Sequence, residues 1–364
     1  MSKKKSRKNA RVELNKVEAQ ATLPPVKTRA KRTLKLRTAA LLSLMLLAGT
    51  TAGVIAWRSQ HGAIESSFSL QSPLSARNSC RRPPTFFAGQ GFGRGVSLST
   101  SERDLIGIAA VEFDPNTKQR SRYWQHPSWS KFGQLSSFTL DRQGDVYVIP
   151  APRVNLADNP PELQNRLYKI DAASGEMQLA LEFPVAALPS ARNPYAGMAL
   201  SYDCDTHSLW LSSVAGSEPA RQRGKVMRIQ LDPIVSVVDQ LDDFDGFGLA
   251  PFNASEALQA GVHQSVQQGL LIASARAGTV MLQAMNADGR LQGRPLDLLS
   301  IAGLGPVGND RVRKIDIDGQ GELVLHGTPF NFNLAQPSAQ HAAVKYRFAW
   351  HVQKRQYAFV DWVQ

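Results

Sequence analysis

The sequence has few cysteines and histidines, and it lacks the short motifs that mark common catalytic centres. Its 364 residues include two cysteines and seven scattered histidines. No H-E-x-x-H pair and no G-x-S-x-G turn occurs, so the motifs typical of zinc proteases and of α/β-hydrolases are absent. These absences make an enzyme less expected, although they leave open a catalytic site assembled from distant segments.

Most of the chain also lacks a large net positive charge, because the basic residues in excess over acidic ones lie near the N-terminus. The formal net charge is +12, but residues 1–37 hold thirteen Lys and Arg against two Glu, a net of +11, which leaves +1 for residues 38–364. A basic protein often binds nucleic acid, but here the basic residues belong to a tail. We therefore expect no nucleic-acid partner, and we expect residues 1–37 to be a disordered cytoplasmic segment.

One long run has no charge at all. Residues 38–57 read TAALLSLMLLAGTTAGVIAW, and twenty residues of helix span about 30 Å, the thickness of a bilayer core. Basic residues crowd its N-terminal side, which orients the N-terminus toward the cytoplasm. We expect a single-pass helix in the inner membrane, with the bilayer as its partner, a tether at 58–83 and an exported periplasmic domain at 84–364. A cleaved signal peptide is the alternative, although the charged leader is long for one.

The two cysteines, Cys80 and Cys204, both follow the apolar run. In an exported domain an even number of cysteines first indicates a disulfide bond. Two buried free thiols are the alternative, because the sequence does not supply the geometry that a disulfide requires.

The exported part repeats one short pattern. Residues 138–148 read FTLDRQGDVYV and residues 315–325 read IDIDGQGELVL, each with two apolar stretches around an acidic residue and a turn that contains glycine. A third copy lies at 198–211, and a fainter one at 262–273 keeps only the glycine. The copies recur at intervals of roughly 60 residues, so the pattern predicts a repeat architecture.

Each copy is followed by a second pair of apolar stretches, which gives four short strands per unit. These pairs are expected at residues 166–183, 225–241, 279–299 and 343–362, after a less regular unit at 84–130. A single four-stranded sheet cannot bury both of its faces, whereas neighbouring sheets around an axis cover one another. We therefore predict an all-β fold, a β-propeller of about five to six four-stranded blades preceded by one N-terminal transmembrane helix.

Residues 138–148 and 167–176 resemble the NHL/YVTN/quinoprotein-like propeller repeats. The resemblance implies the fold and no single activity, since members of that grouping include protein-binding scaffolds, metal-dependent lactonases and quinone enzymes. Quinoprotein blades usually carry a tryptophan after the turn, and here Met177-Gln-Leu follows. The resemblance therefore does not imply a quinone, and no organic cofactor is predicted.

Two stretches are candidates for ligand binding. Arg94 lies in a glycine-alternating loop at 89–95, where it could meet an anion. Trp124, His126 and Trp129 belong to the most aromatic stretch, which suits the stacking of a sugar or a protein contact. Packing between the first two blades is the alternative for these aromatic residues.

The densest acidic cluster is Asp242, Asp243 and Asp245. Three carboxylates this close repel one another unless they are neutralised, so the cluster is the candidate site for a divalent cation, and a solvated loop is the alternative. Residues 316–322 resemble part of a calcium loop. The copy at 141–145 keeps the turn without the full set of carboxylates, so a turn is the better interpretation there.

Together these features predict a membrane-anchored, extracytoplasmic propeller that acts as a binding module, with a protein or envelope partner on its face. Two alternatives remain from the sequence. One is a metal-assisted hydrolase of the lactonase-like type, with acidic and amide side chains from several blades, and the other is a sensor of carbohydrate or of an envelope component.

Overall fold

The computed structural model describes residues 72–364, except residues 94, 103–104, 118, 152–159, 191, 261–263 and 333–342. The predicted tail, the predicted transmembrane segment and the first part of the predicted tether lie outside these residues. Within the described ranges, no helix has the length and apolar character needed to span a bilayer.

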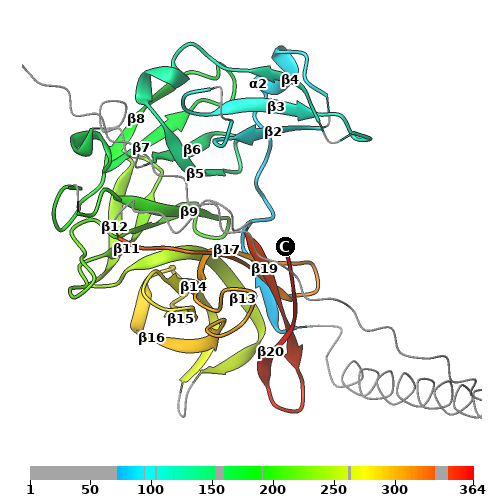
Figure 1. Cartoon of the computed structure of the whole chain (residues 1–364), viewed down its shortest axis with the longest axis vertical. Coiled ribbons are helices and arrows are strands. Elements are labelled where there is room, and N and C mark those ends of the chain that lie inside the picture. The colour runs from blue at the N-terminus through cyan, green and yellow to red at the C-terminus, as the bar shows by residue number, and fades with distance from the viewer. Residues whose placement is uncertain are drawn as a thin grey trace, which may run out of the picture. The chain divides into compact units, whose positions relative to one another are not determined.

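The described chain forms five antiparallel sheets, the blades of a β-propeller (Figure 1). Blade 1 contains β2 (Val96–Ser99), β3 (Ala109–Phe113) and β4 (Arg120–Trp124). Blade 2 contains β5 (Leu135–Leu140), β6 (Val146–Pro150), β7 (Arg166–Ile170) and β8 (Met177–Glu182). Blade 3 contains β9 (Gly197–Asp203), β10 (Ser208–Ser213), β11 (Lys225–Gln230) and β12 (Ser236–Asp242).

Blade 4 contains β13 (Gly246–Ala260), β14 (Gln264–Ser274), β15 (Thr279–Met285) and β16 (Leu291–Ser300), and β1 (Leu74–Ala76) pairs with β13. Blade 5 contains β17 (Arg311–Ile317), β18 (Leu323–Thr328), β19 (Val344–His351) and β20 (Gln356–Val363). The described helices are short: α2 (Phe86–Gly89), η1 (Trp129–Phe132) and η2 (Pro161–Leu163). The predicted all-β propeller is therefore confirmed, with five blades.

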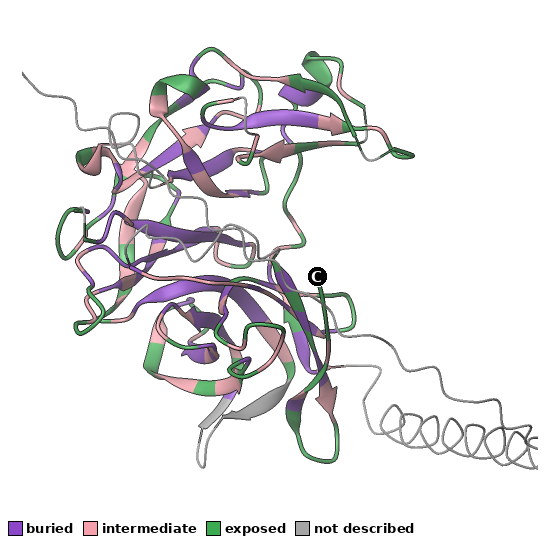
Figure 2. Cartoon of the chain, viewed as in Figure 1, coloured by how far each residue is buried: buried purple, intermediate pink, exposed green. Residues whose placement is uncertain are grey.

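Alternation along the strands places the core between successive blades. In β19, Val344, Tyr346 and Phe348 are buried, whereas Lys345 and Arg347 are exposed, as the period of two in a strand requires. Four clusters of buried side chains join blades 1 and 2, 2 and 3, 3 and 4, and 4 and 5. Figure 2 shows the buried residues concentrated on the strands. Each sheet thus gains its buried area from its neighbours.

Three of the four sequence copies are the hairpins between the first and second strands of their blades. The fourth copy, at 262–273, is not a hairpin centred on its glycine. Gly269 lies inside β14 and pairs with Phe252 of β13, so this part of the prediction is wrong. A Cβ on Gly269 would lie 2.4 Å from the carbonyl oxygen of Gln283 and 2.9 Å from the Phe252 ring. This glycine marks a close approach of neighbouring chains, not a turn.

The two strongest copies form the same turn, built on one carboxylate oxygen. Oδ1 of Asp141 accepts hydrogen bonds from the N–H groups of Gln143 and Asp145, both within 2.9 Å. Oδ1 of Asp318 accepts equivalent bonds from the residues two and four positions later. These aspartates stabilise turns by capping backbone N–H groups, so the interpretation as a repeat explains them.

The segment 72–85, here called the strap, runs across these turns before blade 1 begins. The N–H of Ser72 donates to the carbonyl of Gln320 in blade 5, and the N–H of Arg82 donates to the carbonyl of Asp141 in blade 2. Between these points β1 pairs with blade 4. Residues 72–83 of the strap fall within the predicted tether, and that prediction is wrong for them, because they bind the blades as part of the folded domain.

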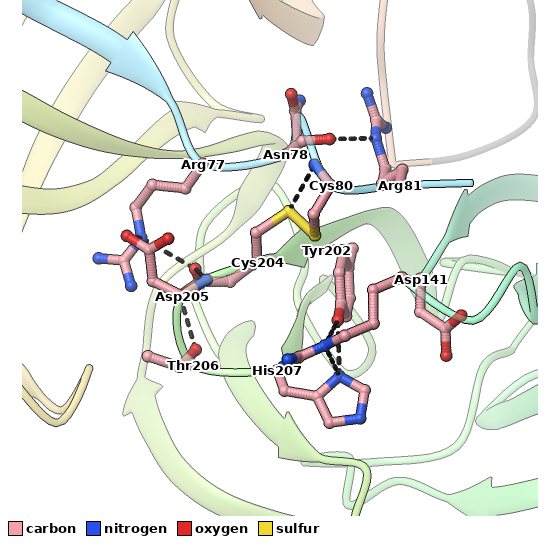
Figure 3. The surroundings of a disulfide bond; sticks show 12 residues. Arg77, Asn78, Cys80, Arg81, Asp141, Tyr202, Cys204, Asp205, Thr206 and His207 are labelled. Atoms are coloured by element: carbon pink, nitrogen blue, oxygen red, sulfur yellow. Dashed lines mark hydrogen bonds and ion pairs between the residues drawn. A yellow bond between two sulfur atoms is a disulfide. The ribbon is translucent and has the colours of Figure 1, made fainter.

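A disulfide and an ion pair hold the strap to blade 3 (Figure 3). Cys80 and Cys204 form the disulfide, 124 residues apart in sequence. Nε of Arg77 lies 2.8 Å from Oδ1 of Asp203, and both side chains are almost fully buried. A loop of this length gives a chain-entropy stabilisation of about 4–5 kcal/mol when closed. The disulfide and the ion pair therefore fix the middle of the strap.

Replacing Gly321 by alanine tests the fit of the strap on its turns. Gly321 has a φ of +77°, and a Cβ there would lie 2.3 Å from the carbonyl oxygen of Leu74 in the strap. We expect Gly321→Ala to lower the free energy of unfolding by about 1–3 kcal/mol, from strain and steric overlap together. Chemical denaturation of the full chain would measure the change.

Gly319→Ala is the matched control, two residues earlier in the same turn. Nothing lies within 4 Å of a Cβ at Gly319, so its effect should stay within about 0.5 kcal/mol. Equal effects of the two substitutions would contradict the proposed contact between strap and turn.

Candidate functional site

A cavity of about 630 Å³ lies at the end of the propeller where the inner strands begin. Its lining includes Arg311, the first residue of β17, and Arg276, in the loop between β14 and β15. Arg192 precedes β9, and Phe330 and Phe332 follow β18. This Arg–Phe cavity is therefore assembled from segments of blades 3, 4 and 5 that are distant in sequence.

Arg276 is held by contacts on every side of its guanidinium. Nε lies 2.5 Å from Oδ2 of Asp245, and the two Nη atoms donate to the carbonyls of Pro219 and Glu218 at 2.8 Å. The guanidinium carbon stands 4.9 Å from the centre of the Phe332 ring, a cation–π arrangement. Arg276 thus forms a fixed wall of the cavity, with its charge offset by Asp245.

Asp245 is the buried anchor of this wall. Its side chain also accepts hydrogen bonds from the Ser217 hydroxyl and the Gly224 N–H, at 2.5 and 2.9 Å.

The other two acidic residues of the predicted cation cluster have different surroundings. Asp242 pairs with Lys225, and Asp243 is exposed with a φ of +52°. The structure therefore does not bring the three carboxylates together. In the part of the chain that it describes, no group of three His, Cys, Asp or Glu side chains is placed to hold a metal ion.

Arg311 is half-buried and less completely bonded. Its Nη1 donates to the carbonyls of Asn309 and Asp310, at 2.6 and 3.1 Å. Its Nε is buried and has no acceptor among the described residues. Burial lowers the pKa of Arg311, while Asp310 acts in the opposite direction. A desolvated cation with an unsatisfied donor is costly, and a negatively charged ligand would offset that cost.

Aromatic rings form the apolar side of the cavity. The centre of the Phe330 ring lies 4.9 Å from Phe247, 5.2 Å from Tyr195 and 5.4 Å from Phe332. Tyr195 and Phe247 contact Phe330 without lining the cavity, and burial raises the pKa of Tyr195. The cavity therefore offers cationic and apolar surfaces side by side.

The aromatic residues predicted to bind a ligand lie in the core between blades 1 and 2. Trp129 is fully buried, and its indole N–H donates to the carbonyl of Gly175 at 2.7 Å. Trp124 and His126 are half-buried, and the Trp124 and Trp129 rings are 5.0 Å apart. Trp129 therefore packs between the first two blades, which was the alternative to ligand binding, and it has no exposed surface to offer a ligand. Arg94 lies outside the described residues.

Sequence reasoning missed the arginines of the Arg–Phe cavity. Arg192, Arg276 and Arg311 sit in three separate loops or strand ends, and no motif surrounds any of them. The only local signal is position, because each lies beside a strand boundary where loops gather at one end of a propeller.

Comparison with known proteins assigns no activity to this chain. No family model matches the sequence, and no curated protein matches it either. Among solved structures, the chain is similar to a glucose dehydrogenase (TM-score 0.37, 14% identity, covering 68% of this chain and 77% of that chain). It is also similar to a soluble aldose sugar dehydrogenase from Escherichia coli (0.37, 11%, 68% and 78%) and to a protein from Lactobacillus plantarum (0.41, 9%, 72% and 64%). Likenesses this distant assign no substrate to this chain.

The structure predicts unequal roles for the aspartates of the acidic cluster. Asp245→Asn removes the charge that faces Arg276 in a buried setting, so we expect a loss of about 3 kcal/mol in the free energy of unfolding. Asp242→Asn, the matched control, affects a pair whose carboxylate is 55% exposed, and its loss should stay below about 1 kcal/mol. Urea denaturation would measure the free energy of unfolding of both variants. Similar losses for Asp245→Asn and Asp242→Asn would contradict the role of Asp245 as the buried partner of Arg276.

Proposed function

We propose that the chain is a membrane-anchored binding protein whose propeller takes an anionic ligand with an apolar part. The ligand would occupy the Arg–Phe cavity. The observation that carries the proposal is Arg311, a half-buried guanidinium with an unsatisfied Nε, beside two further arginines and two phenylalanines.

The dimensions and chemistry of the cavity support this proposal. Its volume of about 630 Å³ falls in the range of roughly 300–1,000 Å³ that is common for small-molecule sites. Guanidinium groups match the oxygens of carboxylates, sulfonates and phosphates. The Phe330 and Phe332 rings add an apolar surface for the body of the ligand.

The ionisable residues of the cavity favour binding over hydrolysis. Among the described residues that line it, arginine is the one ionisable type, and none of them is a His, Asp, Glu, Cys, Ser or Lys. Arginine stays protonated under ordinary conditions, so it is a poor general base, and no described side chain of the lining is a nucleophile.

Location outside the cytoplasm is the second part of the proposal. The uncharged run at 38–57, the basic residues before it and the disulfide support it, because disulfides persist in oxidising compartments. The membrane anchor would then hold the propeller in the periplasm, where the partner or ligand is met.

Naphthalene-1-sulfonate, an aromatic anion, tests the proposed cavity. We expect saturable binding to the full chain in a neutral detergent, measured by isothermal titration calorimetry in matched buffer. Arg311→Gln should weaken binding at least tenfold, since it removes the least satisfied guanidinium. The exposed arginine Arg294 in β16 supplies the control, and Arg294→Gln should leave the affinity within twofold.

The neutral isostere naphthalene-1-sulfonamide separates charge from apolar contact. It should bind at least tenfold more weakly than the sulfonate. Equal affinity of the two compounds, or an equal effect of the two arginine substitutions, would contradict an anion site in the Arg–Phe cavity.

A further inference from the structure

A second basic cavity lies under the strap, at the end of the propeller opposite the Arg–Phe cavity. It has a volume of about 680 Å³ and is lined by Ser79, Cys80, Arg81, Arg82, Arg142 and Gln143. Three of these residues are arginines and none carries a carboxylate. The strap contributes four of the six, and the turn between β5 and β6 contributes the other two. We call it the strap cavity.

Two of its arginines are fixed through Nε alone. Nε of Arg142 donates to the Tyr202 hydroxyl at 3.0 Å and lies 3.2 Å from Nδ1 of His207. Nε of Arg81 donates to the carbonyl of Asn78 at 3.0 Å (Figure 3). Within the described ranges, the terminal nitrogens of both guanidinium groups have no hydrogen-bond acceptor. Each arginine is thus oriented through its Nε, and its two terminal NH2 groups stay available to a ligand.

Three carboxylates close to the arginines of the strap cavity have other partners. Asp141 is buried and accepts hydrogen bonds from the N–H groups of its own turn. Asp316 attracts Arg81, but its carboxylate pairs with Lys314 and His326 at 2.8 Å. The carboxylate of Asp232 lies 2.7 Å from Nε2 of His207. Among the described residues, Arg81, Arg82 and Arg142 therefore form no ion pair with a carboxylate.

We infer that the strap cavity is a binding site for a phosphate group. Three guanidinium groups around one space suit a tetrahedral dianion, which presents several oxygens to several donors, better than a single carboxylate. The disulfide at Cys80 and the hydrogen bond from the Arg82 N–H to the carbonyl of Asp141 hold the backbone of Arg81 and Arg82 beside the turn that carries Arg142. The phosphate could belong to a lipid headgroup or to a soluble compound, and both share this chemistry.

Titration of the full chain in neutral detergent with inorganic phosphate tests the site. We expect saturable binding with a Kd of about 1 mM or tighter. The triple variant Arg81→Gln, Arg82→Gln, Arg142→Gln should weaken it at least tenfold. A charge-matched control changes Arg290, Arg294 and Lys354, which are exposed elsewhere, to Gln, and should stay within twofold of the unmodified chain.

If the triple variant does not fold, Arg82→Gln alone still tests the site, because Arg82 is exposed and its side chain makes no hydrogen bond or ion pair with the described residues. It should weaken phosphate binding at least threefold. Absence of saturable phosphate binding to the unmodified chain, or equal losses in the cavity and control variants, would overturn the inference. Neither the triple variant nor Arg82→Gln should change the affinity of the Arg–Phe cavity for naphthalene-1-sulfonate. The phosphate site and the anion site can therefore be refuted independently of each other.

A second arm distinguishes the two sources of phosphate. The full chain is placed in nanodiscs made equally anionic with phosphatidylglycerol or with oleate, which lacks phosphate. If inorganic phosphate binds more weakly in the phosphatidylglycerol nanodisc than in the oleate nanodisc, the lipid headgroup competes for the site. That result would support the inference and assign the site to a lipid headgroup. Equal binding in the two nanodiscs would support it with a soluble phosphate compound as the ligand.

Discussion

The strap, residues 72–85, is the one segment in the described part of the chain that binds four successive blades, through backbone hydrogen bonds, strand pairing and a disulfide bond. The arrangement of the described blades depends on these contacts. In the described residues, apolar clusters join blades 1 to 2, 2 to 3, 3 to 4 and 4 to 5, and none of them joins blade 5 to blade 1. The strap contacts blade 5 at Ser72 and then reaches blade 1 after touching the blades between. Its buried Arg77–Asp203 pair and its disulfide therefore fix the middle of this link at blade 3.

The structure uses arginine in several different ways, and the surroundings of each guanidinium decide which. Arg77 is buried against Asp203, and removing either partner would leave an uncompensated charge. Arg276 is neutralised by Asp245 and stacked on Phe332. Arg311 and Arg142, in contrast, keep donors without protein acceptors in the described residues. The first two serve the fold, and the last two are the sites at which an anion would be bound.

Much of the fold could be predicted from the sequence because strand pairs and turns are local. The turns at Asp141 and Asp318 follow from the side chain and the glycine next to them, and strands such as Thr279–Met285 were expected at their observed positions. Gly269 shows the limit. A glycine that relieves a contact with Gln283 and Phe252 is indistinguishable in sequence from one that forms a turn.

The sequence by itself determined the all-β repeat, the concentration of net positive charge in the first 37 residues and the position of both cysteines after the apolar run at 38–57. Only the tertiary structure decided that the strap belongs to the domain and which side chains share a cavity. Arg192, Arg276 and Arg311 meet because three blades present their loops at one end of the propeller. That meeting depends on distances between residues far apart along the chain, and the local pattern of a sequence does not contain those distances.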